Sequence, residues 1–272
     1  MSELPNGFDD ATLREALDVA IAAADAAARI HRGHQGGPMG VRTKSTDIDL
    51  VTEVDTLSEE AIRTILAERY PDHAFLGEES GQDVEARCRW IVDPLDGTVN
   101  YAHGFPFYCV SIALEVDSQV LVAVVQDTAH GERFTAMRSH GAFVDGRRLR
   151  VSETTDPRES MVSTGFSYDA PTIERNLPVL NRVLPRTRGL RRAGAAALDL
   201  CYVAAGRVDA FWEYRLNAWD VAAGLLMVRE AGGSVTGEDG SPYRWDHQAM
   251  LASNGAVHAK LMDLLGLDRT IA

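Results

Sequence analysis

Two aspartates, Asp93 and Asp96, stand three positions apart directly after an apolar run at residues 90–92. Two carboxylates this close repel each other unless a positive charge lies between them, and oxygen-ligated divalent cations commonly supply that charge. Gly97 and Thr98 follow at once, and the free backbone N–H groups of a chain entering a helix bind anions. The segment therefore predicts a metal site and a phosphate site on one turn.

Further carboxylates stand where predicted helices and strands begin or end. Asp55 precedes a predicted helix, Glu78 follows a short predicted strand, and Asp220 lies at the start of an apolar helix. Each of them alone is equally well explained as a helix cap or as a solvated charge. The pair Asp93 and Asp96 is the stronger signal, because the strand before it is apolar enough to be buried.

Other catalytic machinery is not recognisable in the sequence. There is no HExxH or GxSxG motif, and none of the eight histidines stands in metal-ligand spacing. Residues 40–45 superficially resemble a phosphate-binding loop, but the glycine before the lysine is missing and no strand or helix frames them. Cys88, Cys109 and Cys201 are predicted to be buried free thiols of a protein in a reducing compartment.

The chain is acidic, with 40 Asp and Glu against 27 Lys and Arg and a formal charge of −13. This charge argues against direct binding to nucleic acid or to an anionic membrane. The basic clusters at residues 147–150 and 186–192 are interpreted as solvated or dimer-edge faces. The first ten residues lack a basic signal region, and the apolar stretch at residues 20–28 is too short and too charged to span a membrane. We therefore expect a cytoplasmic protein.

The elements of the N-terminal half must bring the carboxylates together. Helices are predicted over residues 10–32 and from about residue 58 to 70, and residues 33–46 are predicted to form a mobile loop. A Gly-containing turn at residues 145–146 predicts a hairpin. Strands are predicted over residues 74–77, 90–92, 108–116, 120–127, 133–137, 142–144 and 147–151.

After residue 157 the predicted strands and helices alternate. The strands lie near residues 161–164, 189, 208–214 and 250–253, and the helices over 172–184, 195–205, 219–231 and from 256 onward. We therefore expect an α/β fold with an α+β half at residues 1–155 and an α/β half at residues 156–272. No linker separates the halves, so residues 1–272 are predicted to form a single unit.

Four separated segments resemble motifs of the inositol monophosphatase family. Residues 90–100 (WIVDPLDGTVN) resemble its first signature, and residues 219–224 (WDVAAG) with 230–233 (EAGG) resemble its second. Residues 77–80 (GEES) and the block at 44–55 resemble two further motifs, in the family's order. The resemblance covers nearly the whole chain. It implies the layered αβαβα sandwich of the inositol monophosphatase and fructose-1,6-bisphosphatase type, and a homodimer.

The resemblance also implies roles for individual residues. Two or three Mg²⁺ ions would be held by Glu78, Asp93, the backbone carbonyl of Leu95, Asp96 and Asp220. The attacking water would be activated by Asp55, Glu78 and Thr98. The substrate would be contacted by Asp96, Gly97, Thr98, Ala196 and Glu213, while Lys44 would lie in the family's mobile loop. Val99 and Ala195 depart from the family, which commonly has Thr or Ser at these positions.

The activity that the resemblance implies is hydrolysis of inositol 1-phosphate to inositol and phosphate. The protein would be a Mg²⁺-dependent, lithium-sensitive phosphomonoesterase that uses metal-activated water and forms no phosphoenzyme. Glu213 favours a polyol, because a carboxylate accepts hydrogen bonds from vicinal hydroxyls.

Other functions within the family stay open. Histidinol phosphate and fructose 1,6-bisphosphate are alternative substrates. A substrate such as 3′-phosphoadenosine 5′-phosphate is disfavoured, because no aromatic or basic cluster in the sequence predicts a nucleotide pocket. A bacterial member of the family serves as a partner in transcription and ribosome assembly, which gives a non-catalytic alternative.

Overall fold

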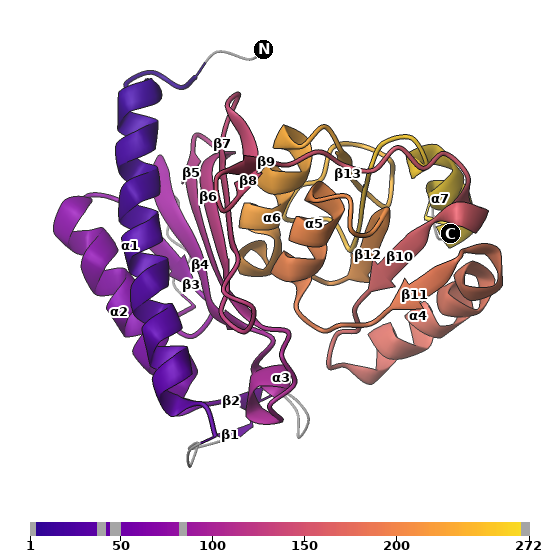
Figure 1. Ribbon diagram of the computed structural model, residues 1–272, viewed down its shortest axis with the longest axis horizontal. Helices are drawn as coiled ribbons and strands as arrows, with labels where there is room; N and C mark the ends of the chain where they lie inside the picture. Colours follow the sequence, from indigo (N-terminus) through magenta and orange to yellow (C-terminus); the bar gives the residue numbers. More distant parts are fainter. Residues whose placement is uncertain (1–3, 37–41, 44–49, 82–85, 268–272) are drawn as a thin grey trace.

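The computed structural model describes residues 4–36, 42–43, 50–81 and 86–267 of the chain. Two sheets alternate with three layers of helices (Figure 1). Helices α1 and α2 cover the outer face of a seven-stranded sheet, α5 and α6 lie between this sheet and a five-stranded one, and α4 and α7 cover the far face of the latter. The predicted αβαβα sandwich is therefore confirmed.

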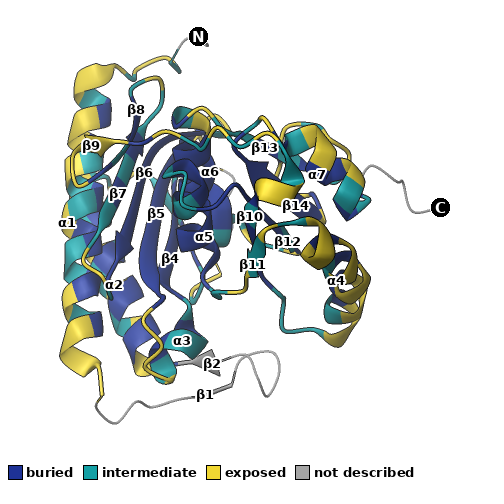
Figure 2. Ribbon diagram, turned by 45° about the vertical axis from the view of Figure 1, so that its right-hand side comes forward, coloured by how far each residue is buried: buried dark blue, intermediate teal, exposed yellow. Residues whose placement is uncertain are grey.

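The seven-stranded sheet has the order β3-β4-β5-β6-β7-β8-β9. Only β3 and β4 run parallel; the other neighbours are antiparallel. Because helices cover both faces, the central strands are buried along nearly their whole length (Figure 2). The strands span Ala74–Gly77, Cys88–Asp96, Cys109–Val116, Gln119–Asp127, Arg133–Met137, Gly141–Val144 and Arg147–Arg148.

The two N-terminal helices lie side by side on this sheet. Helix α1 (Asp10–His34) is capped by Asp9, and its alanine-rich stripe allows close approach to the sheet. Helix α2 (Glu53–Arg69) begins five residues before the predicted start at residue 58. The reason is a capping box, in which the Thr52 side chain accepts from the helix backbone while Asp55 accepts from the Thr52 N–H.

The five-stranded sheet has the order β11-β10-β12-β14-β13. Strands β11, β10 and β12 run parallel to one another. Strand β14 runs antiparallel to both of its neighbours, β12 and β13. The strands span Met161–Thr164 (β10), Gly189–Arg191 (β11), Ala210–Tyr214 (β12), Ser234–Gly237 (β13) and Ala249–Ser253 (β14). The helices around it span Ala170–Val183 (α4), Ala196–Ala204 (α5), Ala218–Glu230 (α6) and His258–Leu265 (α7).

Three predictions need correction. Strand β13 was not predicted, because its four residues (SVTG) carry a single apolar side chain. Strand β9 ends at Arg148, short of residue 151, because β8 begins at Gly141 and the Val151 N–H bonds to the Ala231 carbonyl instead. Strand β4 continues to Asp96 through a bulge instead of ending at residue 92.

One apolar cluster contains residues from both sheets and from α5 and α6 between them. The two sheets thus share one core, and the single unit over residues 1–272 stays a prediction. No helix in the described ranges is both long and apolar enough to cross a membrane.

Candidate active site

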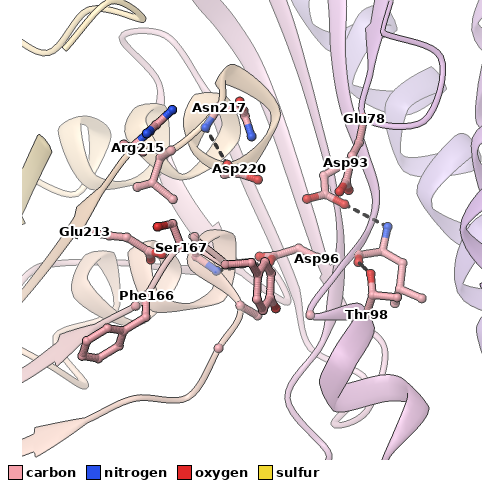
Figure 3. Close-up of a pocket in the computed structure, with 18 of the residues that line it drawn as sticks. Glu78, Asp93, Asp96, Thr98, Phe166, Ser167, Glu213, Arg215, Asn217 and Asp220 are labelled. Carbon is pink, nitrogen blue, oxygen red and sulfur yellow. Dashed lines mark hydrogen bonds between the residues drawn. The ribbon is translucent and has the colours of Figure 1, made fainter. Parts of the chain in front are cut away.

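A cavity of about 420 Å³ opens where the two halves of the molecule meet. One wall comes from β3, β4 and the short helix α3 (Thr98–Ala102), and the other from β12 and the segment after β10 (Figure 3). The lining residues that carry carboxylates are Glu78, Asp93, Asp96, Asp169, Glu213 and Asp220.

The bulge in β4 sets the positions of Asp93 and Asp96. The pairing of β4 with β5 shifts register between these two residues. Inside the bulge the Leu95 N–H donates to Asp93 Oδ1 at 3.0 Å, and the Leu95 carbonyl oxygen lies 3.0 Å from Thr98 Oγ1. Both aspartates thus stay buried while facing the cavity, with the Asp93 side chain turned toward Glu78 (Figure 3).

Asp96 caps a helix that belongs to the other half of the molecule. Helix α5 starts after Ala195, which has no side-chain oxygen to satisfy the first N–H groups. The N–H groups of Ala196 and Ala197 instead donate to the two oxygens of Asp96, at 3.2 and 2.7 Å. Asp96 is therefore held by two helix N–H groups, and Ala196 lies at the cavity as predicted.

Asp55 reaches the site from the first turn of α2. Its Oδ1 accepts from Thr98 Oγ1 at 2.8 Å, while its Oδ2 accepts from the Thr52 N–H and hydroxyl at 2.9 and 2.6 Å. The carboxylate is completely buried. The capping box of α2 thus also orients Thr98, a contact across 43 residues of sequence.

Glu78 and Asp220 close the acidic end of the cavity from two different elements. Glu78 follows β3, where its N–H bonds to the Val92 carbonyl at 3.2 Å. Asp220 is the third residue of α6, and its Oδ2 accepts from the Asn217 N–H at 2.6 Å (Figure 3). The predicted metal ligands of both signatures therefore lie around one cavity.

The acidic groups shift one another's pKa. Burial raises the pKa of Asp93 well above its ordinary range, and the neighbouring Glu78, Asp96 and Asp220 raise it further. Burial also raises the pKa of Asp96 to about 7, although the Ala197 and Ala196 N–H groups oppose this shift. So many carboxylate oxygens gathered around one cavity fit a hard divalent cation.

The carboxylates fit such an ion in kind and location. Within the described part of the chain, however, no three of them already converge as a closed metal cluster. An incoming ion would thus have to draw these side chains together.

This arrangement predicts a pH-dependent stability of the metal-free protein. The Asp96 pKa lies near 7 in the folded state and near 3.8 when the group is unperturbed. Between these values the folded state holds a proton that the unfolded state has lost, so the free energy of unfolding falls as pH rises toward and through 7. With a chelator present, we expect a lower melting temperature at about pH 8 than at about pH 5.5.

Thermal unfolding measured at both pH values, with EDTA and then with excess Mg²⁺, checks this expectation. Magnesium should reduce the difference in melting temperature between the two pH values. Asp96→Asn should reduce the pH dependence of the melting temperature of the metal-free protein. A metal-free melting temperature that rises with pH would contradict the assignment.

The buried His31 of α1 contacts the turn that carries Asp93 and Asp96, and this role was not predicted. Its Nε2 lies 3.0 Å from the Pro94 carbonyl and its Nδ1 lies 3.2 Å from Thr128 Oγ1. Since a carbonyl only accepts, Nε2 carries the proton and Nδ1 accepts from Thr128. Burial lowers the pKa of His31 to about 4, so the ring is neutral. Its place in the buried stripe of α1 was the only signal in the sequence.

Replacing His31 with phenylalanine should destabilise the protein. The Pro94 carbonyl and the Thr128 hydroxyl would lose their partner inside the core, which costs about 1–3 kcal/mol. Urea unfolding measures this loss. His34→Phe is the matched control, because His34 lies on the same helix but is exposed, and its effect should stay within about 0.5 kcal/mol. Equal effects of the two substitutions would count against a supporting role.

Several cavity residues were not assigned to the site by the sequence analysis. They are Phe166, Ser167, Tyr168, Asp169, Arg192, Arg215 and Asn217. Arg192 belongs to a basic cluster that was interpreted as a solvated or dimer-edge face, but it lines this cavity. The sequence has no aromatic or basic cluster that predicts a nucleotide pocket, yet two aromatic rings and two guanidinium groups lie at the cavity. They come from three separate segments, so no single run of sequence reveals them. Lys44 lies outside the described residues.

Known proteins resemble this chain over nearly its whole length. A model of the inositol monophosphatase family matches residues 12–266. An inositol-1-monophosphatase of Synechocystis is 41% identical over 261 residues, which cover 95% of this chain and 91% of that protein. A Nus factor SuhB of Pseudomonas aeruginosa is 46% identical over 200 residues, covering 71% and 74%.

A solved structure agrees with the fold. The inositol monophosphatase from Anabaena superposes with a TM-score of 0.85 at 38% identity, covering 94% of this chain and 96% of that one. The layered fold and the acidic cavity thus place the protein among the α/β phosphatases. The chain belongs to the inositol monophosphatase family.

Proposed function

We propose that the protein is a Mg²⁺-dependent phosphomonoesterase that hydrolyses inositol 1-phosphate and related small polyol phosphates. The observation that carries this proposal is that Glu78, Asp93, Asp96 and Asp220 all line one cavity beside the N-terminus of α3. In a protein of charge −13, a phosphate group can lie next to these carboxylates only if cations neutralise them first.

Each residue of the acidic end has a role in this proposal. Glu78, Asp93, the Leu95 carbonyl, Asp96 and Asp220 would hold two or three Mg²⁺ ions, with Asp93 shared between two of them. When bound, Mg²⁺ lowers the pKa of a water molecule and stabilises charge on the leaving oxygen.

Asp55 and Thr98 would orient the attacking water. Asp55 accepts the hydroxyl proton of Thr98 across 2.8 Å, which leaves the hydroxyl oxygen free to accept a proton from water. Thr52 holds the other Asp55 oxygen, so the pair has little freedom to turn away. Glu78, on the same wall, would accept a second hydrogen bond from that water. No side chain needs to become phosphorylated.

The phosphate would be held at the start of α3. Gly97 has φ = +92°, and a side chain there would approach the Phe107 carbonyl oxygen to 2.9 Å. Close packing therefore requires glycine at this turn, and the N–H groups of Gly97 and Thr98 at the helix start would bind the phosphate. Ala196 and the half-buried Glu213 would face the substrate's hydroxyls on the opposite wall.

Phosphate release from a panel of monophosphates tests this function. We expect turnover of inositol 1-phosphate with Mg²⁺, its loss in EDTA and its inhibition by lithium. Histidinol phosphate and fructose 1,6-bisphosphate belong in the panel as the alternative substrates. Failure to hydrolyse any of them under saturating Mg²⁺ would refute the enzyme proposal.

The likeness to a Nus factor favours a second candidate function, as a partner protein in transcription. The acidic charge of this chain points to protein contacts, since it opposes direct RNA binding. An RNA-polymerase complex retained by Asp93→Asn in a pull-down would support this role, and absence of any complex would oppose it. We further propose a cytoplasmic homodimer, which sedimentation of the purified protein can test.

A further inference from the structure

The cavity carries two charges that the proposed hydrolysis leaves unused. Arg192 and Arg215 line it together with the acidic groups. Figure 3 shows Arg215 on the wall of Glu213, across the cavity from Asp93 and Glu78. At about 420 Å³ the cavity falls in the size range of pockets that hold ligands larger than a single phosphate. The proposed hydrolysis therefore assigns no role to these two guanidinium groups.

The backbone of Arg215 is in an unusual conformation. It is one of five non-glycine residues with positive φ in the described chain, at +57°. The other four, Asp117, Ser118, Ser139 and Asp145, lie in the connections between antiparallel strands, where such angles close turns. Arg215 instead follows β12 at the cavity. A left-handed conformation is strained for a residue with a β-carbon, and strain of this kind gathers at functional sites.

The guanidinium of Arg215 is only loosely held. Its side chain is 59% exposed, and its single ion pair is a 3.8 Å contact with Asp169. Asp169 already caps α4 and accepts from the Thr172 N–H, the Thr172 hydroxyl and the Ser167 hydroxyl at 3.0, 2.8 and 2.7 Å. The contact with Asp169 therefore leaves the guanidinium able to bind a ligand. The backbone of Arg215 is fixed, because its backbone N–H donates to the Gln248 carbonyl at 2.9 Å.

Arg192 approaches the cavity over a glycine. Gly194 has φ = +91°, and a β-carbon there would lie 2.7 Å from Arg192 Nη1. The guanidinium thus occupies the space that any other residue's side chain would fill, just before the start of α5. No hydrogen bond or ion pair of the Arg192 side chain occurs within the described ranges.

We propose that Arg192 and Arg215 form a second anion subsite, which favours substrates with a further phosphate or carboxylate group away from the scissile phosphate. The guanidinium fork matches the oxygens of either group. Glu213, near the end of β12 and two residues before Arg215, would repel an anion placed too deep and accept hydrogen bonds from hydroxyls in between. The inference rests on the proposed function, because it concerns the same cavity.

Two matched substrate pairs test the subsite. Fructose 1-phosphate against fructose 1,6-bisphosphate isolates a second phosphate, and glycerol 3-phosphate against 3-phosphoglycerate isolates a carboxylate. The readout is the ratio of kcat/KM for the doubly charged member to that for the singly charged one. In Arg215→Gly and Arg192→Gln, we expect this ratio to fall about tenfold in at least one pair, mainly through KM, as for a lost charged hydrogen bond.

The matched control is Arg244→Ala. Arg244 is 58% exposed and pairs with Asp246 at 3.1 Å, as an ordinary surface arginine outside the cavity. It should leave both ratios unchanged. Melting temperatures verify folding, and Arg215→Gly should not lower them, because glycine adopts positive φ without strain. Arg215→Lys, which keeps the charge but not the fork, should give an intermediate ratio.

The outcomes separate the two proposals. If the wild type hydrolyses neither inositol 1-phosphate nor any member of the two pairs, the proposed function fails. If it hydrolyses inositol 1-phosphate but neither doubly charged substrate, the subsite is overturned while the function stands. If it hydrolyses the pairs and both arginine variants keep the wild-type ratios, the subsite is likewise overturned while the function stands. If one pair responds and the other does not, the subsite holds and its ligand is the oxyanion of the responding pair.

Discussion

Asp93→Asn should abolish phosphate release while making the metal-free protein more stable. The substitution removes the charge of the carboxylate proposed to lie between two ions, so a loss of about 10³-fold or more is expected, as for removal of a preorganised electrostatic group. The stability effect follows from crowding: burial and the charges of Glu78, Asp96 and Asp220 raise the pKa of Asp93 because its ionised form is unfavourable there.

A variant that loses phosphate release while its stability rises cannot have lost activity through misfolding. A neutral amide of nearly the same shape relieves repulsion in the absence of metal, and each kcal/mol gained raises the melting temperature by about 2–4 °C in a protein of this size class. Phosphate release and thermal unfolding with EDTA are the measurements. Asp246→Asn, at an exposed site outside the cavity, is the control for both. An active Asp93→Asn enzyme would remove the basis of the metal assignment.

Thr98→Ala should lower kcat by about 10²-fold with a smaller change in KM. The hydroxyl connects Asp55 to the position proposed for the attacking water, since it donates to Asp55 Oδ1 at 2.8 Å. Removing it leaves that carboxylate oriented by Thr52 but unable to act on water. Steady-state kinetics at saturating Mg²⁺ measure the change.

Thr98→Ser is the informative comparison for this prediction. Serine keeps the hydroxyl and loses only a methyl group, so it should recover most of the rate. Recovery would assign the effect to the hydrogen bond with Asp55. A serine variant as slow as the alanine variant would instead show that packing at the start of α3 matters more than the hydroxyl.

Local patterns predicted most of the fold. The buried stripe of α1, the apolar runs of β5 and β6, and the hairpin at Asp145 and Gly146 depend on neighbours along the chain. The earlier start of α2 was missed because residues 53–57 lack the apolar periodicity of the later turns. It is fixed by the side chains of Thr52 and Asp55 acting on the backbone.

The site was predictable only in part, because its parts meet through contacts distant in sequence. The acidic ligands could be proposed from motifs, and the structure brings Glu78, Asp93, Asp96 and Asp220 to one cavity. The Asp96 contact with α5 spans 101 residues and depends on how the two sheets are stacked. The support from His31 to the turn spans 63 residues and also has no local signature.

The hydrogen bonds of Asp96 also limit hinge motion between the two sheets. A hinge motion that parted the two sheets at the cavity would pull the carboxylate away from the Ala196 and Ala197 N–H groups and leave the first turn of α5 uncapped. These hydrogen bonds therefore hold the two walls of the cavity together at the carboxylate that is proposed to bind metal. We expect substrate and product to pass through the existing opening of the cavity, and turnover to proceed without a hinge closure of the two halves.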